Sequence, residues 1–159
     1  MEDLSGGFNL YRFQQRAFPV LLCWALGSIA AGVVWMKNRD GLVTGFGSQF
    51  AGWGAINLIL ALFGMRGASR NLGRQAQGEI SASEHARQAR YFERLVLVNA
   101  GLDLGYIAAG AWLRAKPAGQ PEKRPGFRNG MGWGIVTQGA FLLVWDLLLG
   151  LLVHKRRNA

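Results

Sequence analysis

The run Ala17–Met36 reads AFPVLLCWALGSIAAGVVWM and contains no charged side chain. About 20 apolar residues are enough for an α-helix to cross a bilayer. Three further runs of similar length carry at most one charge each: Gly41–Met65, Leu95–Leu113 and Asn129–Val153. A soluble helical bundle would show polar faces at the helical period, and these runs show almost none. The sequence therefore predicts an all-α fold, a four-helix transmembrane bundle.

The four runs set the expected domain organisation. We expect one integral membrane domain over residues 1–159, with spans at about 17–36, 44–65, 95–114 and 131–153. A polar loop is expected from Arg66 to about Ile80, after the second span. Ser81-Ala-Ser-Glu84 then has the pattern of a capping box. An amphipathic helical extension on the cytoplasmic side is therefore expected over about 81–94, leading into the third span.

A sequence repeat links the first and third spans. Leu26-Gly-Ser-Ile-Ala-Ala-Gly32 and Leu104-Gly-Tyr-Ile-Ala-Ala-Gly110 differ at one position and lie 78 positions apart. For the second and fourth spans, a separation of 89 positions pairs Asn57 with Asp146. These matches predict two duplicated helical hairpins with the same orientation in the membrane. The alternative explanation is chance, because Gly- and Ala-rich membrane helices resemble one another.

The distribution of basic residues predicts the orientation of the chain. Four spans put both termini on one side, which collects eleven Lys and Arg residues against seven on the other. Basic residues accumulate on the cytoplasmic side of membrane proteins, so both termini are expected in the cytoplasm. The expected location is a bacterial inner (plasma) membrane.

The net charge of +9 also limits the class of partner. In a soluble protein this charge would suggest nucleic acid, but here the basic residues stand in loops and tails, where they suit anionic headgroups. No interleaved aromatic and basic motif is present, so no nucleic-acid binding is expected. The residues expected to contact lipid headgroups are Arg87, Arg90, Arg94, Lys155, Arg156 and Arg157.

Polar side chains inside the spans are the candidate functional residues, because such groups usually face the bundle interior. Asn57, Asp103 and Asp146 each lie seven or eight residues from the same end of their spans. They are therefore expected to form one layer. Asn99 and Tyr106 fall on the same helix face as Asp103.

Two glutamines are expected to form a second layer. Gln49 and Gln138 each precede a member of the first layer by eight residues, which places them nearer the opposite end of the spans.

The two intramembrane aspartates leave two interpretations open. The four apolar runs contain no Lys or Arg to neutralise Asp103 and Asp146. An isolated ionised carboxylate is strongly disfavoured in a low dielectric, so at least one of the two is expected to be protonated at neutral pH. The layer could hold the helices together by hydrogen bonds, or it could form a proton- or cation-responsive site.

Three stripes of small residues, which let helix backbones approach closely, complete the pattern. They are Gly41-x-x-x-Gly45, Gly101-x-x-x-Gly105-x-x-x-Ala109 and Gly130-x-x-x-Gly134. Close packing inside the bundle is the expected use, and an oligomer face is the alternative.

Catalytic and cofactor motifs are missing from the sequence. His85 and His154 do not form a pair across the spans, as a b-type haem would need. No Cys/His cluster is present for zinc, and no Ser-His or Cys-His arrangement is evident. We therefore expect no bound metal, no cofactor and no enzymatic activity.

Four short motifs carry a resemblance to a known group of proteins. They are Gly52-Trp-Gly-Ala-Ile-Asn57, Gly101-Leu-Asp-Leu-Gly-Tyr106, Gly132-Trp-Gly134 and Trp145-Asp146. This pattern resembles a family of small uncharacterised bacterial membrane proteins with four spans. The resemblance implies the four-span fold and no known activity.

The sequence thus predicts a multi-pass membrane protein without enzymatic activity. Its leading interpretation is a role in interaction or assembly, with the bilayer and either a second copy or another membrane protein as partners. The alternative is a small proton-coupled transporter or channel that uses Asp103 and Asp146.

Overall fold

The computed structural model describes residues 8–115 and 124–158. It contains the helices α1 (Leu10–Met36), α2 (Gly41–Ala76), α3 (Ala82–Ala115) and α4 (Phe127–Arg157). All four are long and apolar enough to cross a membrane, judged by length and composition. No strand occurs in the described ranges. The predicted all-α fold with four membrane-spanning helices is confirmed.

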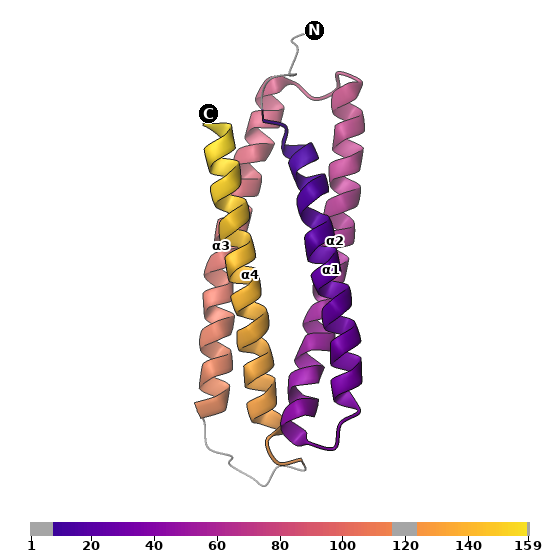
Figure 1. Ribbon diagram of the computed structural model, residues 1–159. Helices are drawn as coiled ribbons and strands as arrows, with labels where there is room; N and C mark the ends of the chain where they lie inside the picture. Colours follow the sequence, from indigo (N-terminus) through magenta and orange to yellow (C-terminus); the bar gives the residue numbers. More distant parts are fainter. Residues whose placement is uncertain (1–7, 116–123, 159) are drawn as a thin grey trace.

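The helices run up and down as two hairpins that stand side by side (Figure 1). α1 packs on α2, α3 packs on α4, and the two hairpins meet mainly through α2 and α4. The start of α1, the end of α4 and the α2–α3 connection lie at one end, called here the terminal end. The α1–α2 connection, the end of α3 and the start of α4 lie at the other end, called the loop end.

Side-chain caps explain where the first three helices begin. The Asn9 side chain accepts hydrogen bonds from the backbone N–H groups of Tyr11 and Arg12, and Asp40 caps α2 in the same way. The Ser81 hydroxyl accepts a hydrogen bond from the Glu84 N–H at 3.2 Å, as its capping-box pattern predicts. Such caps satisfy N–H groups that have no acceptor inside their own helix.

The expected polar loop from Arg66 to Ile80 is wrong over most of its length, because α2 continues to Ala76. The added turns bury Ala68 and pack Leu72 against other helices, and they are rich in good helix formers. The helix stops just before Gly78, whose φ of 75° suits the left-handed end of a helix. With 36 residues, α2 is about 54 Å long and projects beyond a bilayer core of about 30 Å.

The two repeated heptads make equivalent contacts in their own hairpins. A methyl carbon added at Gly47 of α2 would lie 2.8 Å from the carbonyl oxygen of Gly32. A methyl carbon added at Gly132 of α4 would lie 2.7 Å from the carbonyl oxygen of Gly110. The last glycine of each heptad therefore touches a glycine of the following helix.

A second pair of contacts repeats the equivalence two turns away. A methyl carbon added at Gly54 would lie 3.0 Å from the carbonyl oxygen of Ala25, and one at Gly139 would lie 3.3 Å from that of Asp103. Gly47 and Gly132 are 85 positions apart, and so are Gly54 and Gly139. Equivalent contacts of α2 and α4 therefore correspond to a separation of 85 positions, whereas the sequence comparison predicts 89. The two hairpins therefore pack their helices through equivalent contacts.

The hairpins join at the loop end through four glycines, called here the glycine seam: Gly41, Gly45, Gly130 and Gly134. A methyl carbon at Gly45 would overlap the Phe127 carbonyl group, and one at Gly130 would overlap the Leu42 carbonyl group. The backbones of α2 and α4 therefore touch directly, as small residues allow. The third stripe behaves differently, because Gly101 and Gly105 face open space.

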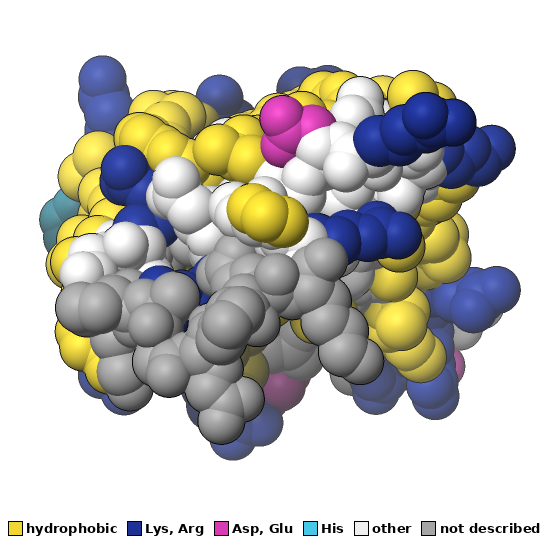
Figure 2. All heavy atoms as spheres, turned by 90° about the horizontal axis from the view of Figure 1, so that it is seen from below, with side chains coloured by type: hydrophobic (Ala, Val, Ile, Leu, Met, Phe, Trp, Pro, Cys, Tyr) yellow, Lys and Arg dark blue, Asp and Glu magenta, His cyan; other side chains and the backbone are white. Residues whose placement is uncertain are grey.

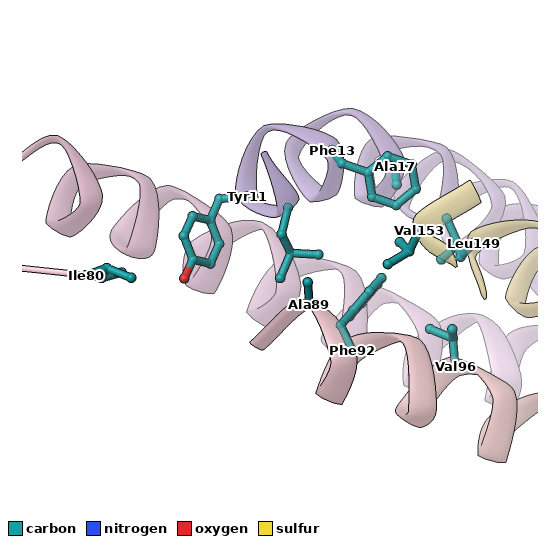
Figure 3. Packing of buried hydrophobic residues seen from close by; sticks show 10 residues of the cluster. Tyr11, Phe13, Ala17, Ile80, Ala89, Phe92, Val96, Leu149 and Val153 are labelled. Carbon is teal, nitrogen blue, oxygen red and sulfur yellow. The ribbon is translucent and has the colours of Figure 1, made fainter. Parts of the chain in front are cut away.

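At the terminal end, large apolar side chains hold the hairpins together. The buried cluster comprises Leu10, Tyr11, Phe13, Ala17, Ile80, Ala89, Phe92, Val96, Leu149 and Val153. Figure 3 shows Phe92 and Val96 of α3 lying close to Leu149 and Val153 of α4. This terminal-end core draws on α1, α3 and α4.

A glycine-to-alanine pair tests the seam. The Gly130→Ala substitution should destabilise the bundle by about 2 kcal/mol or more, because the added methyl group meets rigid backbone. The Gly101→Ala substitution serves as the matched control, since its methyl group meets nothing within 4 Å. Thermal unfolding in detergent measures both. Equal melting temperatures for the two variants would contradict the seam.

A histidine ties the start of α1 to α3. The backbone N–H of Leu10, which has no acceptor within α1, donates to His85 Nε2 at 3.1 Å. The His85 ring also meets the Tyr11 ring edge-on at 5.3 Å between centroids. Burial lowers the pKa of His85 from its ordinary value of 6.5, so the folded protein favours the neutral ring that can accept this hydrogen bond.

This tie should weaken in acid. The folded state binds fewer protons on His85 than the unfolded state, so its stabilising contribution is present above pH 6.5 and is lost as pH falls below that value. Hydrogen exchange at residues 10–13, corrected for the intrinsic rate, should accelerate when the pH is lowered to about 5. The His85→Phe variant should exchange fast at both pH values. Unchanged protection of the wild type in acid would refute the tie.

Candidate functional site

Two polar side chains, Asn57 and Asp103, lie buried inside the bundle, and each has a buried atom without a hydrogen-bond partner among the described residues. Asn57 of α2 is 1% exposed and Asp103 of α3 is 3% exposed. In the part of the chain that the structure describes, neither Asn57 Nδ2 nor Asp103 Oδ2 has a hydrogen-bond partner. Buried polar atoms are rarely left in this state, because each one costs about 1–3 kcal/mol. These two atoms define the candidate site.

A ring contact fixes the relative depth of the two side chains. Trp53 of α2 meets Tyr106 of α3 edge-on, with 4.8 Å between the ring centroids. Asn57 lies one helical turn from Trp53, and Asp103 lies one turn from Tyr106. Since α2 and α3 run in opposite directions, both steps lead toward the terminal end. Asn57 and Asp103 therefore lie at nearly the same depth, just beyond the Trp53–Tyr106 pair.

The second aspartate lies farther toward the terminal end and is less buried. Asp146 of α4 and Asn99 of α3 are both partly exposed. Asp103 and Asp146 are close enough to interact electrostatically. The predicted first layer thus has a buried part, Asn57 and Asp103, and a partly exposed part, Asp146 and Asn99. The name polar layer is used below for Asn57, Asp103 and Asp146.

The two glutamines that were expected in a second layer make different contacts. Gln138 is fully buried on α4 and bonds to α1. Its oxygen accepts from Trp24 Nε1 at 2.9 Å, and its Nε2 donates to the Ser28 hydroxyl at 3.2 Å. The side-chain stem of Gln49 instead packs on Gly134. Among the described hydrogen bonds, none joins the two glutamines.

Trp24 and Ser28 are therefore structural residues that the sequence prediction missed. Both lie in the uncharged first run, where no contrast in polarity marks them. The available signal was the Trp24 indole N–H, which needs an acceptor when it is buried. The Trp24 ring also stacks on Phe141 of α4 at 3.8 Å between centroids.

The predicted headgroup residues stand at the terminal end in two different states. Arg87, Arg90, Arg94, Lys155 and Arg156 are exposed, whereas Arg157 is half-buried and pairs with Glu93 at 3.1 Å. Arg87 forms an ion pair with Glu84. Seen from the loop end, Lys and Arg side chains stand out around the periphery of the molecule (Figure 2).

The described ranges contain no group of three or more His, Cys, Asp or Glu side chains placed to hold a metal ion. Many large apolar side chains face outward along the helices, with Phe63 68%, Val34 66% and Leu151 64% exposed. Outward apolar side chains and an inward polar layer are the arrangement that a bilayer requires.

The helices, their apolar exterior and the buried layer define a multi-pass membrane protein with four helical spans. The chain belongs to DUF6992, a protein family of unknown function, which matches residues 20–147. The predicted membership of an uncharacterised family is confirmed. The matched range includes every residue of the polar layer and both glutamines. No curated protein and no solved structure matches the chain.

A glutamine pair tests the link between α1 and α4. The Gln138→Met variant should unfold at a lower temperature, with a loss of about 1 kcal/mol of stability for the hydrogen bonds it removes. The Gln49→Met variant is the control, because no hydrogen bond of the Gln49 side chain is found in the described ranges. Thermal unfolding followed by tryptophan fluorescence checks both. A greater loss for Gln49→Met would contradict the assignment.

Proposed function

We propose that this protein is a small proton-coupled transporter or channel in which Asp103 takes up and releases the proton. The observation that supports the proposal is the pair of buried, unpartnered atoms Asn57 Nδ2 and Asp103 Oδ2. A protonated Asp103 can donate a hydrogen bond, and an ionised one can accept a hydrogen bond from the Asn57 amide. The two groups therefore offer a site that could serve both protonation states.

The contrast with Gln138 favours function over structural support. A polar residue that only holds helices together should have its hydrogen bonds satisfied, as Gln138 does with Trp24 and Ser28. Asn57 and Asp103 are equally buried, and their free atoms make no such bonds in the described ranges. Unsatisfied polar atoms at this depth lower stability, so a role beyond support is the better explanation.

The surrounding residues suggest a route for the proton. Asn99 lies one turn from Asp103 on the same helix face, and Asp146 lies on the neighbouring helix α4. Both are more exposed than Asp103 and lie toward the terminal end. On the loop-end side, the Trp53–Tyr106 ring contact borders the layer, and Tyr106, which is 38% exposed, carries a hydroxyl group. We propose that exchange with water occurs from the terminal end.

We also propose the orientation and the location. The asymmetry of eleven basic residues against seven supports a cytoplasmic terminal end. A bacterial inner membrane is the proposed location. The proposed activity needs no bound cofactor and no enzymatic step.

Interaction or assembly is the second candidate function. The small-residue stripe at Gly101 and Gly105 faces away from the bundle, where it could let a second copy or another membrane protein approach closely. Asp103 lies inside the bundle, so the Asp103→Asn variant should stop a proton pathway and leave assembly through this stripe intact.

Proton flux into vesicles tests the primary proposal. Vesicles that contain the protein and an internal pH-sensitive dye should acidify several-fold faster than empty vesicles after an external acid jump, with K⁺ and valinomycin present so that K⁺ efflux balances the proton charge. The Asp103→Asn variant should return the rate to that of empty vesicles, because its amide cannot carry the proton. The Asp40→Asn variant is the matched control, since Asp40 caps α2 in the loop and Asn can also cap a helix.

Two results would contradict the proposal. The first is a folded Asp103→Asn variant that transports protons as fast as the wild type. The second is a wild-type protein, shown by circular dichroism to be folded, that acidifies vesicles no faster than lipid alone.

A further inference from the structure

Each helix has its first Lys or Arg beyond the apolar run at a similar level of the terminal end. Beyond the apolar runs, the first basic residues are Arg16 on α1, Arg66 on α2, Arg94 on α3 and Lys155 on α4. Each follows its apolar run within two residues. All four are exposed. They therefore stand where a bilayer around these helices would pass from hydrocarbon to headgroups.

A second tier stands one helical turn farther out. Arg12, Arg70 and Arg90 each lie four residues from the first-tier arginine of their own helix, so each pair shares one helix face. On α4, Arg156 follows Lys155 directly. All members of this tier are exposed as well. The two tiers together are called the basic collar.

Contacts between helices show that the collar residues share one level. Gln15 Nε2 of α1 donates a hydrogen bond to the Ser69 hydroxyl of α2 at 3.2 Å. Gln15 is next to Arg16 in the sequence, and Ser69 is next to Arg70. The Arg156 guanidinium lies 5.6 Å from the centre of the Phe13 ring of α1.

An ion-pair cluster between α3 and α4 fixes α3 at the same level as the other helices. The Glu93 carboxylate of α3 lies 2.8 Å from His154 Nδ1 and 3.1 Å from Arg157 Nη2, both on α4. Glu93 is next to Arg94 in the sequence. Collar residues of all four helices therefore lie at a similar level of the terminal end.

The collar is not neutralised by the protein itself. Within the described ranges, the collar arginines Arg12, Arg16, Arg66, Arg70, Arg90 and Arg94 have no carboxylate within 4.0 Å. Other arginines of this end do have one: Arg74 pairs with Glu79, Arg87 with Glu84 and Arg157 with Glu93. The structure thus separates paired arginines from a ring of unpaired ones.

We propose that the basic collar is a binding surface for anionic phospholipids in one leaflet. Arginine binds phosphate oxygens through two parallel N–H groups, and two arginines one turn apart on one face can hold one headgroup between them. The apolar surface directly beside the first tier accommodates the acyl chains. This inference differs from the sequence expectation, because Arg87 and Arg157 are engaged with carboxylates and the unpaired Arg12, Arg16, Arg66 and Arg70 take their place. It does not depend on the proposed proton site.

A titration with a fluorescent phosphatidylglycerol in phosphatidylcholine micelles tests the proposal. Three variants are compared: Arg16→Gln/Arg66→Gln/Arg94→Gln, the same three positions changed to Lys, and Arg39→Gln/Arg74→Gln/Arg87→Gln. The last removes the same charge outside the collar. The collar Gln variant should bind at least tenfold more weakly than the wild type, since each basic residue near an anionic surface contributes about fivefold in affinity. The Lys variant should keep most of the affinity, and the off-collar variant should bind as the wild type does.

Three results would overturn the proposal. Equal weakening by the off-collar variant would show a diffuse charge effect without a defined surface. Unchanged affinity in the collar Gln variant would show that the collar is not the surface. Full competition by inorganic phosphate would show a phosphate site instead of a lipid surface. If the Gln variant does not fold, the single Arg66→Gln and Arg74→Gln variants provide the same comparison.

Discussion

The direct contact between the backbones of α2 and α4 is the constraint on which the rest of the structure depends. The glycine seam leaves no room for even a methyl group at Gly45 or Gly130. Dispersion and backbone packing, which small residues permit, take the place of the hydrophobic effect as the force between helices inside a bilayer. The seam fixes the two hairpins in register, so it also fixes which side chains of one hairpin face the other.

The hairpins are then held by different forces at different depths. At the loop end they meet through glycine, and at the terminal end they meet through large apolar side chains around Phe92 and Val153. Between these two regions the buried groups include polar side chains as well as apolar ones. One of them, Gln138, satisfies its hydrogen bonds on α1, whereas Asn57 and Asp103 retain free polar atoms. The bundle thus contains both structural polar contacts and a polar pair that structure alone does not explain.

Much of the fold could be predicted because its signals are local. Uncharged runs mark the spans, and Asn9 and Ser81 mark helix starts through hydrogen bonds to their own backbone. The continuation of α2 to Ala76 was missed because the burial of Ala68 and Leu72 depends on helices distant in sequence. The same reason explains why the contacts of Gln138 were missed. Its depth could be counted along its span, but the helix that its side chain faces could not be predicted from the sequence. Small-residue stripes looked alike in sequence, yet the seam glycines pack inside while Gly101 faces outward.

The central claim is that α2 and α3 face each other at the depth of the polar layer, and cross-linking in membranes tests it most directly. With Cys23 replaced by serine, a Trp53→Cys/Tyr106→Cys pair should be joined rapidly by a short bifunctional thiol reagent, because the two large side chains bridge the space between α2 and α3. A Trp53→Cys/Leu102→Cys pair should not, since Leu102 is 54% exposed on the outer surface of α3. Equal cross-linking of both pairs, or of neither, would contradict the arrangement that places Asn57 and Asp103 at the same depth.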